Sequence, residues 1–317
     1  MKRFLIWTAA ILAVILIALG FAGNYMVNFS LSPDPNRQDL DSMKVVLYER
    51  FPDMRPWVDS LETNAILKDT FVVMPSGEKH HAYFLPAPEQ TAKTAIVIHG
   101  YKDSAIKFFF FMRMYNRDFG YNVLMPDLSA HGLSEGDEIQ MGWKDADDVL
   151  HWTKIADELF ALPEEPSQMV IHGVSMGAAT TMNIAGKEEL PDYIKVFIED
   201  CGYTSVWDEY GGQLKEMFSL PKFPILHTAS LVCDIKYGWK FKEASPLESV
   251  SRATHPMLFI HGDADAFVPF WMLEPLYEAK PEPKAKWIVP GTKHARAYDD
   301  YPVEYTEKVG EFLEKYI

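Results

Sequence analysis

A long apolar stretch without charged residues lies near the start of the chain, directly after Lys2 and Arg3. As a helix, residues 4–23 reach roughly 30 Å, which is the thickness of the hydrocarbon core of a bilayer. Basic residues on the N-terminal side favour keeping that end in the cytoplasm, so that the rest of the chain lies outside. We therefore predict an N-terminal transmembrane anchor over residues 1–23, with the following domain on the extracellular side of the cell membrane.

A cleaved secretory signal is the alternative interpretation of this segment. Small residues at positions 18, 20 and 22 offer a cleavage site to a signal peptidase. The apolar run is longer than the core of a usual signal, which favours the anchor. Both interpretations place the remaining chain beyond the membrane.

Residues 24–68 have a different pattern, in which prolines stand among polar and amphipathic segments. Prolines at this density interrupt regular structure near the start of the segment. We predict a tether that is followed by a short helix over about residues 39–51, which packs on the domain beyond it.

From residue 69 to the end at 317, short apolar runs alternate with amphipathic stretches. Two runs on either side of Ser76 and Gly77 predict an antiparallel hairpin. Unbroken apolar runs, typical of strands covered on both faces, lie at 94–100, 121–127, 168–173, 195–200, 256–262 and 286–291. Helical stretches fall between them, roughly at 105–118, 142–160, 176–187, 270–280 and 300–316. The pattern predicts an α/β fold with a mostly parallel central sheet flanked by helices.

One part of this domain, about residues 203–250, has no strand pattern and is rich in aromatic side chains. These are Tyr203, Trp207, Tyr210, Phe218, Phe223, Tyr237, Trp239 and Phe241. An insertion of this kind after a central strand predicts a helical cap over a pocket. The alternative is a set of helices that extends the core.

Composition narrows the range of partners. The chain is 48% hydrophobic, enough for a sizeable core, and its formal net charge of −15 lacks the basic face that nucleic acid requires. We therefore expect no nucleic-acid partner, and any membrane attachment must be hydrophobic. Cys201 and Cys233 have no neighbours typical of a metal or redox motif, and the sequence leaves open whether they pair.

Residues 169–180, MVIHGVSMGAAT, place Ser175 between Gly173 and Gly177 directly after an apolar run. A serine at a G-x-S-x-G turn between strand and helix needs a strained backbone, and both glycines remove side chains that would clash there. Such a turn raises the hydroxyl above the sheet and directs the amide of Met176 into the same space. We predict that Ser175 is a nucleophile held on this elbow.

A second amide is expected from the loop after the strand at 94–100, which ends in His99 and Gly100. Loops leaving this strand commonly supply one donor of an oxyanion hole. The backbone N–H groups of Tyr101 and Met176 are therefore the predicted oxyanion donors. His99 is expected to brace the loop through a hydrogen bond rather than to act as a base.

A base and an acid follow late in the chain, after the predicted strands. His294 lies in the loop before the final helix, from which it can reach over the sheet to Ser175. Asp265 follows the strand at 256–262 and is the preferred acid to orient the imidazole; Asp263 is then expected to brace its loop. Asp200, at the end of another strand, is a weaker rival.

The order Ser175, Asp265, His294 is that of one of the folds in which this triad evolved independently. The Asp-x-Asp spacing lacks the other oxygen ligands of a calcium loop, and no His-rich zinc spacing occurs. We therefore predict no metal and no cofactor.

Five motifs resemble the α/β-hydrolase superfamily: VIHGYKDS, MPDLSAHGLSEG, GVSMGAA, HGDADAFVP and GTKH. The similarity covers about residues 68–317. In particular, these motifs resemble bacterial membrane-anchored or cell-surface hydrolases related to the Bem46-like serine hydrolases and to prolyl-oligopeptidase-type catalytic domains. The H-G-x-x-D-x-x-V-P pattern of these relatives implies that Asp265 is the acid. It also implies that the loop from Asp127 to Gly136 is structural.

These observations together predict a metal-independent serine hydrolase that cleaves a carboxylic ester through an acyl-enzyme. The expected substrate is a small-molecule ester or a short peptide-like compound. A serine peptidase or amidase of the prolyl-oligopeptidase type is the first alternative, because the same triad cleaves amides. A non-catalytic surface module that uses the fold for binding is the second.

Overall fold

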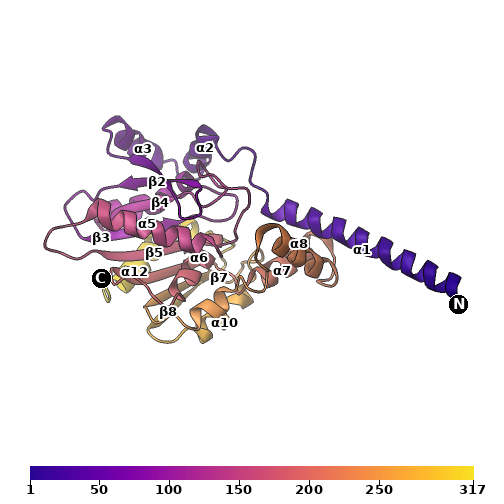
Figure 1. Cartoon of the computed structure of the whole chain (residues 1–317). Coiled ribbons are helices and arrows are strands. Elements are labelled where there is room, and N and C mark those ends of the chain that lie inside the picture. The colour runs from indigo at the N-terminus through magenta and orange to yellow at the C-terminus, as the bar shows by residue number, and fades with distance from the viewer. The chain divides into compact units, whose positions relative to one another are not determined.

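The computed structural model describes all 317 residues, which form two compact units (Figure 1). The first, here called the helical unit, consists of residues Met1–Ser32 and Ser205–Ser245. The second, here called the sheet unit, consists of Pro33–Thr204 and Pro246–Ile317.

The sheet unit is built on one sheet of eight strands. They are β1 (Lys68–Val73), β2 (Lys79–Leu85), β3 (Lys93–Ile98), β4 (Asn122–Pro126), β5 (Gln168–Val174), β6 (Ile194–Asp200), β7 (Met257–Gly262) and β8 (Lys284–Val289). Their order across the sheet is β1-β2-β4-β3-β5-β6-β7-β8. Strand β2 pairs in antiparallel fashion with both of its neighbours, β1 and β4. All the other pairs, from β4–β3 to β7–β8, are parallel. The predicted α/β class, with its edge hairpin and mostly parallel sheet, is confirmed.

Helices cover both faces of this sheet (Figure 1). In chain order they are α2 (Leu40–Arg50), α3 (Met54–Thr63), η1 (Ala105–Phe108), α4 (Phe109–Arg113), η2 (Met114–Asp118), α5 (Asp145–Phe160), α6 (Met176–Ala185), α9 (Pro246–Val250), η3 (Phe270–Met272), α10 (Leu273–Ala279), α11 (Ala297–Asp300) and α12 (Pro302–Leu313). The central strands β3 and β5 are almost entirely buried between these layers, as unbroken apolar runs predict.

One helix that the sequence predicts as continuous is interrupted, and another is preceded by a short additional helix. Residues 105–118 form a 3-10 turn, a short α-helix and a π-turn in succession. The helix expected at 300–316 is observed as α12, and the short α11 before it ends ahead of Tyr301, because Pro302 disfavours helical backbone at the residue before it. Pro302 then occupies the first turn of α12, where its missing N–H has no helical partner to lose.

The segment before the sheet contains the predicted short helix, observed as α2. Asp39 caps it, since its carboxylate accepts a hydrogen bond from the amide of Ser42 at 3.1 Å. Arg50 at the end of α2 forms an ion pair with Asp299 of α11, through a 2.6 Å bond from Nε. This pair ties the segment to the rest of the sheet unit.

The helical unit contains α1 (Lys2–Leu31), α7 (Val206–Phe218) and α8 (Ile225–Tyr237). By length and composition α1 is able to cross a membrane, and a signal sequence has the same features. The strand-free aromatic insertion is helical, as α7 and α8 show. Whether it covers a substrate pocket stays a prediction. Cys201 and Cys233 are both buried, and neither forms a disulfide.

Candidate active site

Ser175 lies at the sharp turn from β5 into α6. Its backbone has φ 58° and ψ −116°, a conformation that costs a non-glycine residue about 1–3 kcal/mol. The surrounding structure compensates this strain: the amide of Ser175 donates to the carbonyl of Asp200 at 2.8 Å, and its carbonyl accepts from Ala179 at 3.0 Å. The elbow therefore has the strained geometry that the sequence predicts.

Gly173 and Gly177 leave no room for a side chain. A Cβ on Gly173 would lie 2.0 Å from the carbonyl oxygen of Gly177, and one on Gly177 would lie 2.2 Å from that of Ile98. Both contacts are with backbone, which cannot rotate away. The two glycines thus allow strand, turn and helix to approach closely enough to form the elbow.

We expect Gly177→Ala to lower both stability and turnover. The added methyl group must push α6 away from β3, at a cost on the order of 2 kcal/mol or more in free energy of unfolding. Thermal unfolding and ester turnover of the same preparation measure the two effects. Gly212→Ala is the matched control, because a Cβ there meets nothing within 4 Å. An unchanged melting temperature for Gly177→Ala would contradict the close packing described here.

The structure brings Ser175, His294 and Asp265 together from three separate strand ends. Ser175 Oγ lies 2.9 Å from His294 Nε2, and His294 Nδ1 lies 2.7 Å from Asp265 Oδ2. A carboxylate can only accept, so Nδ1–H donates to Asp265 and Nε2 is left to accept the hydroxyl hydrogen of Ser175. The hydrogen bonds run in the direction that proton removal from the serine requires.

Asp265 is held rigidly in a buried position. The amides of Phe267 and Val268 donate to its Oδ1 at 2.9 and 3.0 Å, and His261 Nε2 lies 3.4 Å from Oδ2. Burial on its own would raise the pKa of Asp265, but hydrogen bonds from His261 and His294 hold it below its usual value. The carboxylate is therefore charged at neutral pH. The contribution of His261 is a site feature that the sequence did not reveal.

The two rival acids have other partners. Asp263 accepts from the amide of Gly291 at 2.6 Å, which fits the expected bracing of its loop. Asp200 accepts from the hydroxyl of Tyr305 at 2.9 Å, and burial raises the pKa of Asp200 to about 6. Asp265 is the carboxylate that contacts His294.

A buried chain of hydrogen bonds leads away from Asp200. Tyr305 Oη also lies 2.9 Å from Nε2 of His172, whose Nδ1 lies 3.0 Å from Oη of Tyr115. Burial lowers the pKa of His172 to about 3, so this imidazole is neutral. These hydrogen bonds fix the position of Asp200, whose backbone carbonyl in turn accepts a hydrogen bond from the amide of Ser175. Sequence reasoning could not find it, because its members come from four separate elements.

The loop that carries the predicted second oxyanion donor lies beside the elbow. A Cβ on Gly100 would be 3.5 Å from that of Ser175. His99 Nε2 accepts from the amide of Leu128 at 3.0 Å, and its Nδ1–H donates to the carbonyl of Gly100 at 2.8 Å. Both ring nitrogens of His99 are thus occupied in bracing the loop. The roles of the Tyr101 and Met176 amides stay predictions.

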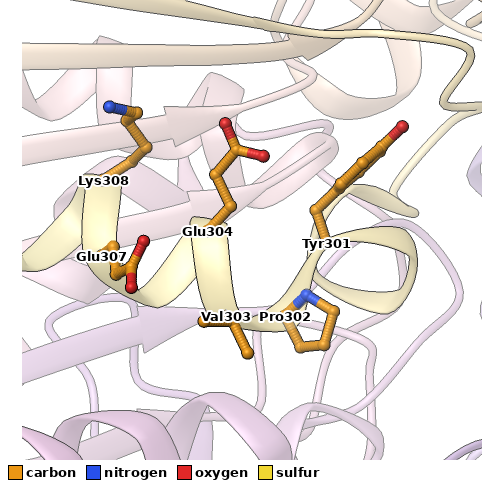
Figure 2. Close-up of a pocket in the computed structure, with 6 residues that line it drawn as sticks. All are labelled: Tyr301, Pro302, Val303, Glu304, Glu307 and Lys308. Atoms are coloured by element: carbon orange, nitrogen blue, oxygen red, sulfur yellow. The ribbon is translucent and has the colours of Figure 1, made fainter.

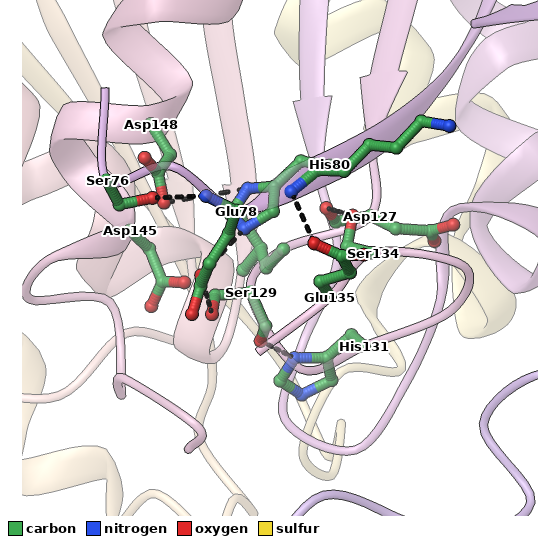
Figure 3. A network of polar contacts seen from close by, with 12 residues as sticks. Ser76, Glu78, His80, Asp127, Ser129, His131, Ser134, Glu135, Asp145 and Asp148 are labelled. Atoms are coloured by element: carbon green, nitrogen blue, oxygen red, sulfur yellow. Dashed lines mark hydrogen bonds and ion pairs between the residues drawn. The ribbon is translucent and has the colours of Figure 1, made fainter. Parts of the chain in front are cut away.

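The loop from Asp127 to Gly136 supports the same region (Figure 3). The Asp127 carboxylate receives His81 Nδ1 at 2.8 Å and the amide of Ala105 at 2.9 Å. His131 accepts from the amide of Lys102 at 3.0 Å, through Nε2. The loop therefore connects the edge hairpin to the segment after β3, a structural role like the one that the resemblance implies.

Cys201 lies behind the site. Its Sγ and ligand atoms of Asp265 and His294 lie within 4.8 Å of one another, the kind of arrangement that could hold a metal ion. Burial raises the pKa of the Cys201 thiol well above its ordinary value, and a protonated thiol is a poor ligand. Asp265 and His294 are in addition bonded to each other. These residues do not fit a resident metal.

A partly buried acidic cluster lies next to the loop in Figure 3. His80 lies 3.1 Å from Glu78 and 3.6 Å from Asp148. Asp145 is fully buried; burial, followed by the charge of Asp148, raises the pKa of Asp145 to about 8. Its Oδ2 accepts from the amide of Gly142 at 2.7 Å. Asp145 is therefore protonated at neutral pH.

We expect this cluster to make stability pH-dependent. Between about pH 4 and pH 8 the folded chain keeps a proton on Asp145 that the unfolded chain releases, so the free energy of unfolding falls as pH rises. Asp145→Asn removes that proton equilibrium and keeps the acceptor for Gly142. Between about pH 4 and pH 8, the free energy of unfolding of this variant should therefore fall by on the order of 2 kcal/mol less than that of the wild type. Urea unfolding at several pH values measures the difference. The exposed neighbour Asp147→Asn is the control, and equal slopes in both variants would contradict the account.

A hollow on the surface of α12 contains none of the predicted site residues (Figure 2). It is lined by Tyr301, Pro302, Val303, Glu304, Glu307 and Lys308. It lies on one helix, is open to solvent and brings no nucleophile and base together.

The sheet order and the position of Ser175 between β5 and α6 define an α/β-hydrolase fold of the serine hydrolase class. The chain belongs to the prolyl oligopeptidase family, whose model matches residues 109–317. This membership makes the protein a serine hydrolase.

The chain is also similar to a curated relative in sequence and to solved structures in fold. The chain is 29% identical to the uncharacterized protein YqkD of Bacillus subtilis, over 99% of this chain and 98% of that protein. The esterase Pf2001 of Pyrococcus furiosus has a similar structure, with a TM-score of 0.62 and 22% identity over 79% of this chain and 90% of that one. The acylaminoacyl peptidase of Pyrococcus horikoshii matches with a TM-score of 0.59 and 17% identity, over 78% of this chain and 41% of that one.

Proposed function

We propose that this protein hydrolyses a carboxylic ester of a small molecule through an acyl-enzyme on Ser175. One observation carries the proposal: on a strained elbow, Ser175 Oγ lies 2.9 Å from His294 Nε2, and Nδ1 of that imidazole is 2.7 Å from a buried carboxylate. This is the arrangement in which a histidine removes a serine proton while an aspartate orients it.

The reaction has two steps that use the same base. In the first, His294 takes the proton of Ser175, Oγ forms a bond with the ester carbonyl carbon, and the alcohol leaves with that proton. In the second, His294 takes a proton from water, whose oxygen attacks the acyl-enzyme and releases the acid and Ser175. Asp265 stays charged throughout and stabilises the imidazolium that forms in each step.

The developing oxyanion is proposed to lie between the amides of Tyr101 and Met176. Met176 is the first residue of α6, so the positive end of the helix dipole adds to its N–H. Each donor of such a hole contributes about 3–4 kcal/mol to transition-state stabilisation in other enzymes. The bracing of Gly100 by His99 supports the role of the Tyr101 amide, since a donor must be fixed before the reaction.

Hydrolysis of an amide is the second candidate. The family is named after an oligopeptidase, and a structurally similar protein is an acylaminoacyl peptidase. The same triad serves both reactions, and the choice depends on the pocket rather than on the three residues. The similarity of an esterase over nearly its whole length favours the ester.

We further propose that α1 anchors the protein in the cell membrane, with the sheet unit on the outer side. Residues 4–23 have the length and the absence of charge that a span requires, and Lys2 and Arg3 favour a cytoplasmic N-terminus. A signal sequence is the alternative, which N-terminal sequencing of the mature protein from membranes distinguishes.

Parallel kinetics on matched substrates test the ester proposal. The full-length chain in detergent is assayed with a series of p-nitrophenyl acyl esters and with aminoacyl p-nitroanilides. We expect turnover of short-chain esters and little cleavage of the anilides. Preference for the anilides would assign the protein to the peptidases. If neither the esters nor the anilides were cleaved, both the ester and the amide proposals would be contradicted.

A further inference from the structure

Residues 217–235 of the helical unit carry a concentration of exposed large apolar side chains. They are Met217, Leu220, Phe223, Leu231 and Ile235. Single exposed apolar residues are common on protein surfaces, but a group of this size within so short a segment indicates a surface that contacts something apolar. This set is called the α7–α8 patch below.

Part of the patch lies on one side of α8. Leu231 and Ile235 are one helical turn apart, so their side chains project from the same face. The opposite side of the helix carries the buried residues Leu226, Ala229 and Cys233. Helix α8 therefore has apolar residues on two opposite faces. One face is buried in the core of the unit, and the other is exposed.

The end of α1 packs directly on α8 (Figure 1). Gly23, Val27 and Leu31 are the buried residues of α1, and they share one face of that helix. A Cβ on Gly23 would lie 2.8 Å from Cγ2 of Thr228, so the two helices are in close contact there. Gly23 is also the last residue of the predicted membrane-spanning stretch.

Further contacts hold this junction together. Lys236 Nζ donates to Asn28 Oδ1 at 2.8 Å and contacts Asn24 Oδ1 at 3.4 Å. The ring of Phe29 packs edge-on against Phe218, with 5.6 Å between centroids. Residues 23–31 span about 12 Å of helix, so the part of α1 that holds α8 begins at the end of the apolar stretch and crosses the adjoining headgroup layer, which is roughly 5–8 Å thick.

The charge of the insertion fits the same surroundings. Residues 205–245 contain five lysines and five acidic residues, whereas the whole chain has a net charge of −15. A neutral segment is not repelled by anionic lipid as the rest of the chain is. Lysine and aromatic side chains with apolar neighbours are typical of the interface between headgroups and acyl chains.

We propose that the α7–α8 patch lies in the lipid interface, so that the protein contacts its membrane at a second site besides α1. The proposal rests on the proposed anchoring of α1. Burial of the patch in the acyl boundary removes its apolar surface from water, the energy source of interfacial helices. The occupant is a lipid surface rather than a protein partner, because the patch is attached to the segment that enters the bilayer.

Depth measurements with a lipid quencher test this inference. Full-length protein carrying Ile235→Cys is labelled with an environment-sensitive fluorophore and reconstituted into phosphatidylcholine vesicles with or without nitroxide-labelled acyl chains. The native cysteines are both buried, so the introduced thiol is the accessible one. Two further positions are labelled in the same way: Ile11→Cys in α1 and Val303→Cys on α12.

Val303 is a matched control, because it is an exposed aliphatic residue of the sheet unit, 69% exposed against 76% for Ile235 (Figure 2). We expect nitroxide lipid to quench the labels at 11 and 235 by about half or more and to leave that at 303 unchanged. Quenching at 11 without quenching at 235 would overturn the interfacial patch. Equal quenching at 235 and 303 would overturn it as well, since adhesion would then be general. Absence of quenching at 11 would instead refute the anchor.

Discussion

Ester turnover by the Ser175→Ala variant is expected to fall to about one millionth of the wild-type value, which is the loss seen when a triad serine is removed. No other hydroxyl is bonded to His294 Nε2, so the variant has no group to take over the attack. The fold should persist, because alanine fits the same backbone and loses one hydrogen bond. Initial rates at saturating ester and the thermal unfolding midpoint measure the two effects.

Ser76→Ala serves as the control for this variant. Ser76 is exposed in the turn between β1 and β2, and its replacement should leave both turnover and unfolding unchanged. Residual activity of Ser175→Ala within tenfold of the wild type would remove Ser175 from the mechanism. If Ser175→Ala lost stability as well as activity, the turnover of His294→Ala would test whether the reaction needs this serine and its base.

Asp265→Asn is expected to lower turnover by about 10⁴-fold with little change in stability. The amide of asparagine can donate to Nδ1 and so stabilises the tautomer that has its proton on Nε2. That tautomer cannot accept the proton of Ser175. Substrate affinity should change little, because Asp265 is buried behind the imidazole, so the loss should be in kcat rather than KM.

The two rival acids supply the comparison for this prediction. Asp263→Asn and Asp200→Asn keep the contacts of those residues with Gly291 and Tyr305 approximately intact. We expect both to retain turnover within about tenfold of the wild type, since neither holds the imidazole. A larger loss in Asp200→Asn than in Asp265→Asn would mean that the acid of the site has been misassigned.

The fold and the strained elbow at Ser175 were largely predictable from local sequence. Unbroken apolar runs identify the central strands because both faces of the sheet are covered. The G-x-S-x-G elbow is predictable because the nearest neighbours of its glycines are backbone atoms: the Cβ contacts at Gly173 and Gly177 are too short for any other residue.

What could not be predicted depends on side chains that meet from distant elements. Hydropathy does not indicate that His261 contacts Asp265, or that Tyr115, His172 and Tyr305 connect to Asp200. The packing of α1 on α8 is hidden for the same reason. A scale that averages over the apolar stretch gives no weight to one glycine, Gly23, whose lack of a side chain allows the close contact with α8.

The break in the helix predicted at 105–118 has a separate cause. Residues 105–118 are apolar on nearly all sides, with Phe108, Phe109, Phe110 and Phe111 all buried, so periodicity gives no register for a regular helix. Local packing then selects 3-10, α and π turns in succession. At Tyr301, by contrast, the proline that follows in the sequence is sufficient to explain why α11 and α12 do not form one helix.

Covalent labelling with a fluorophosphonate probe tests the central claim most directly, because the probe phosphonylates only a serine that a neighbouring base activates. We predict one adduct per chain in the intact mass, located on the peptide that contains Ser175, and none in His294→Ala. A folded wild-type protein that stays unlabelled would be a binding module rather than a hydrolase. An adduct on any other serine would contradict the assignment of the site.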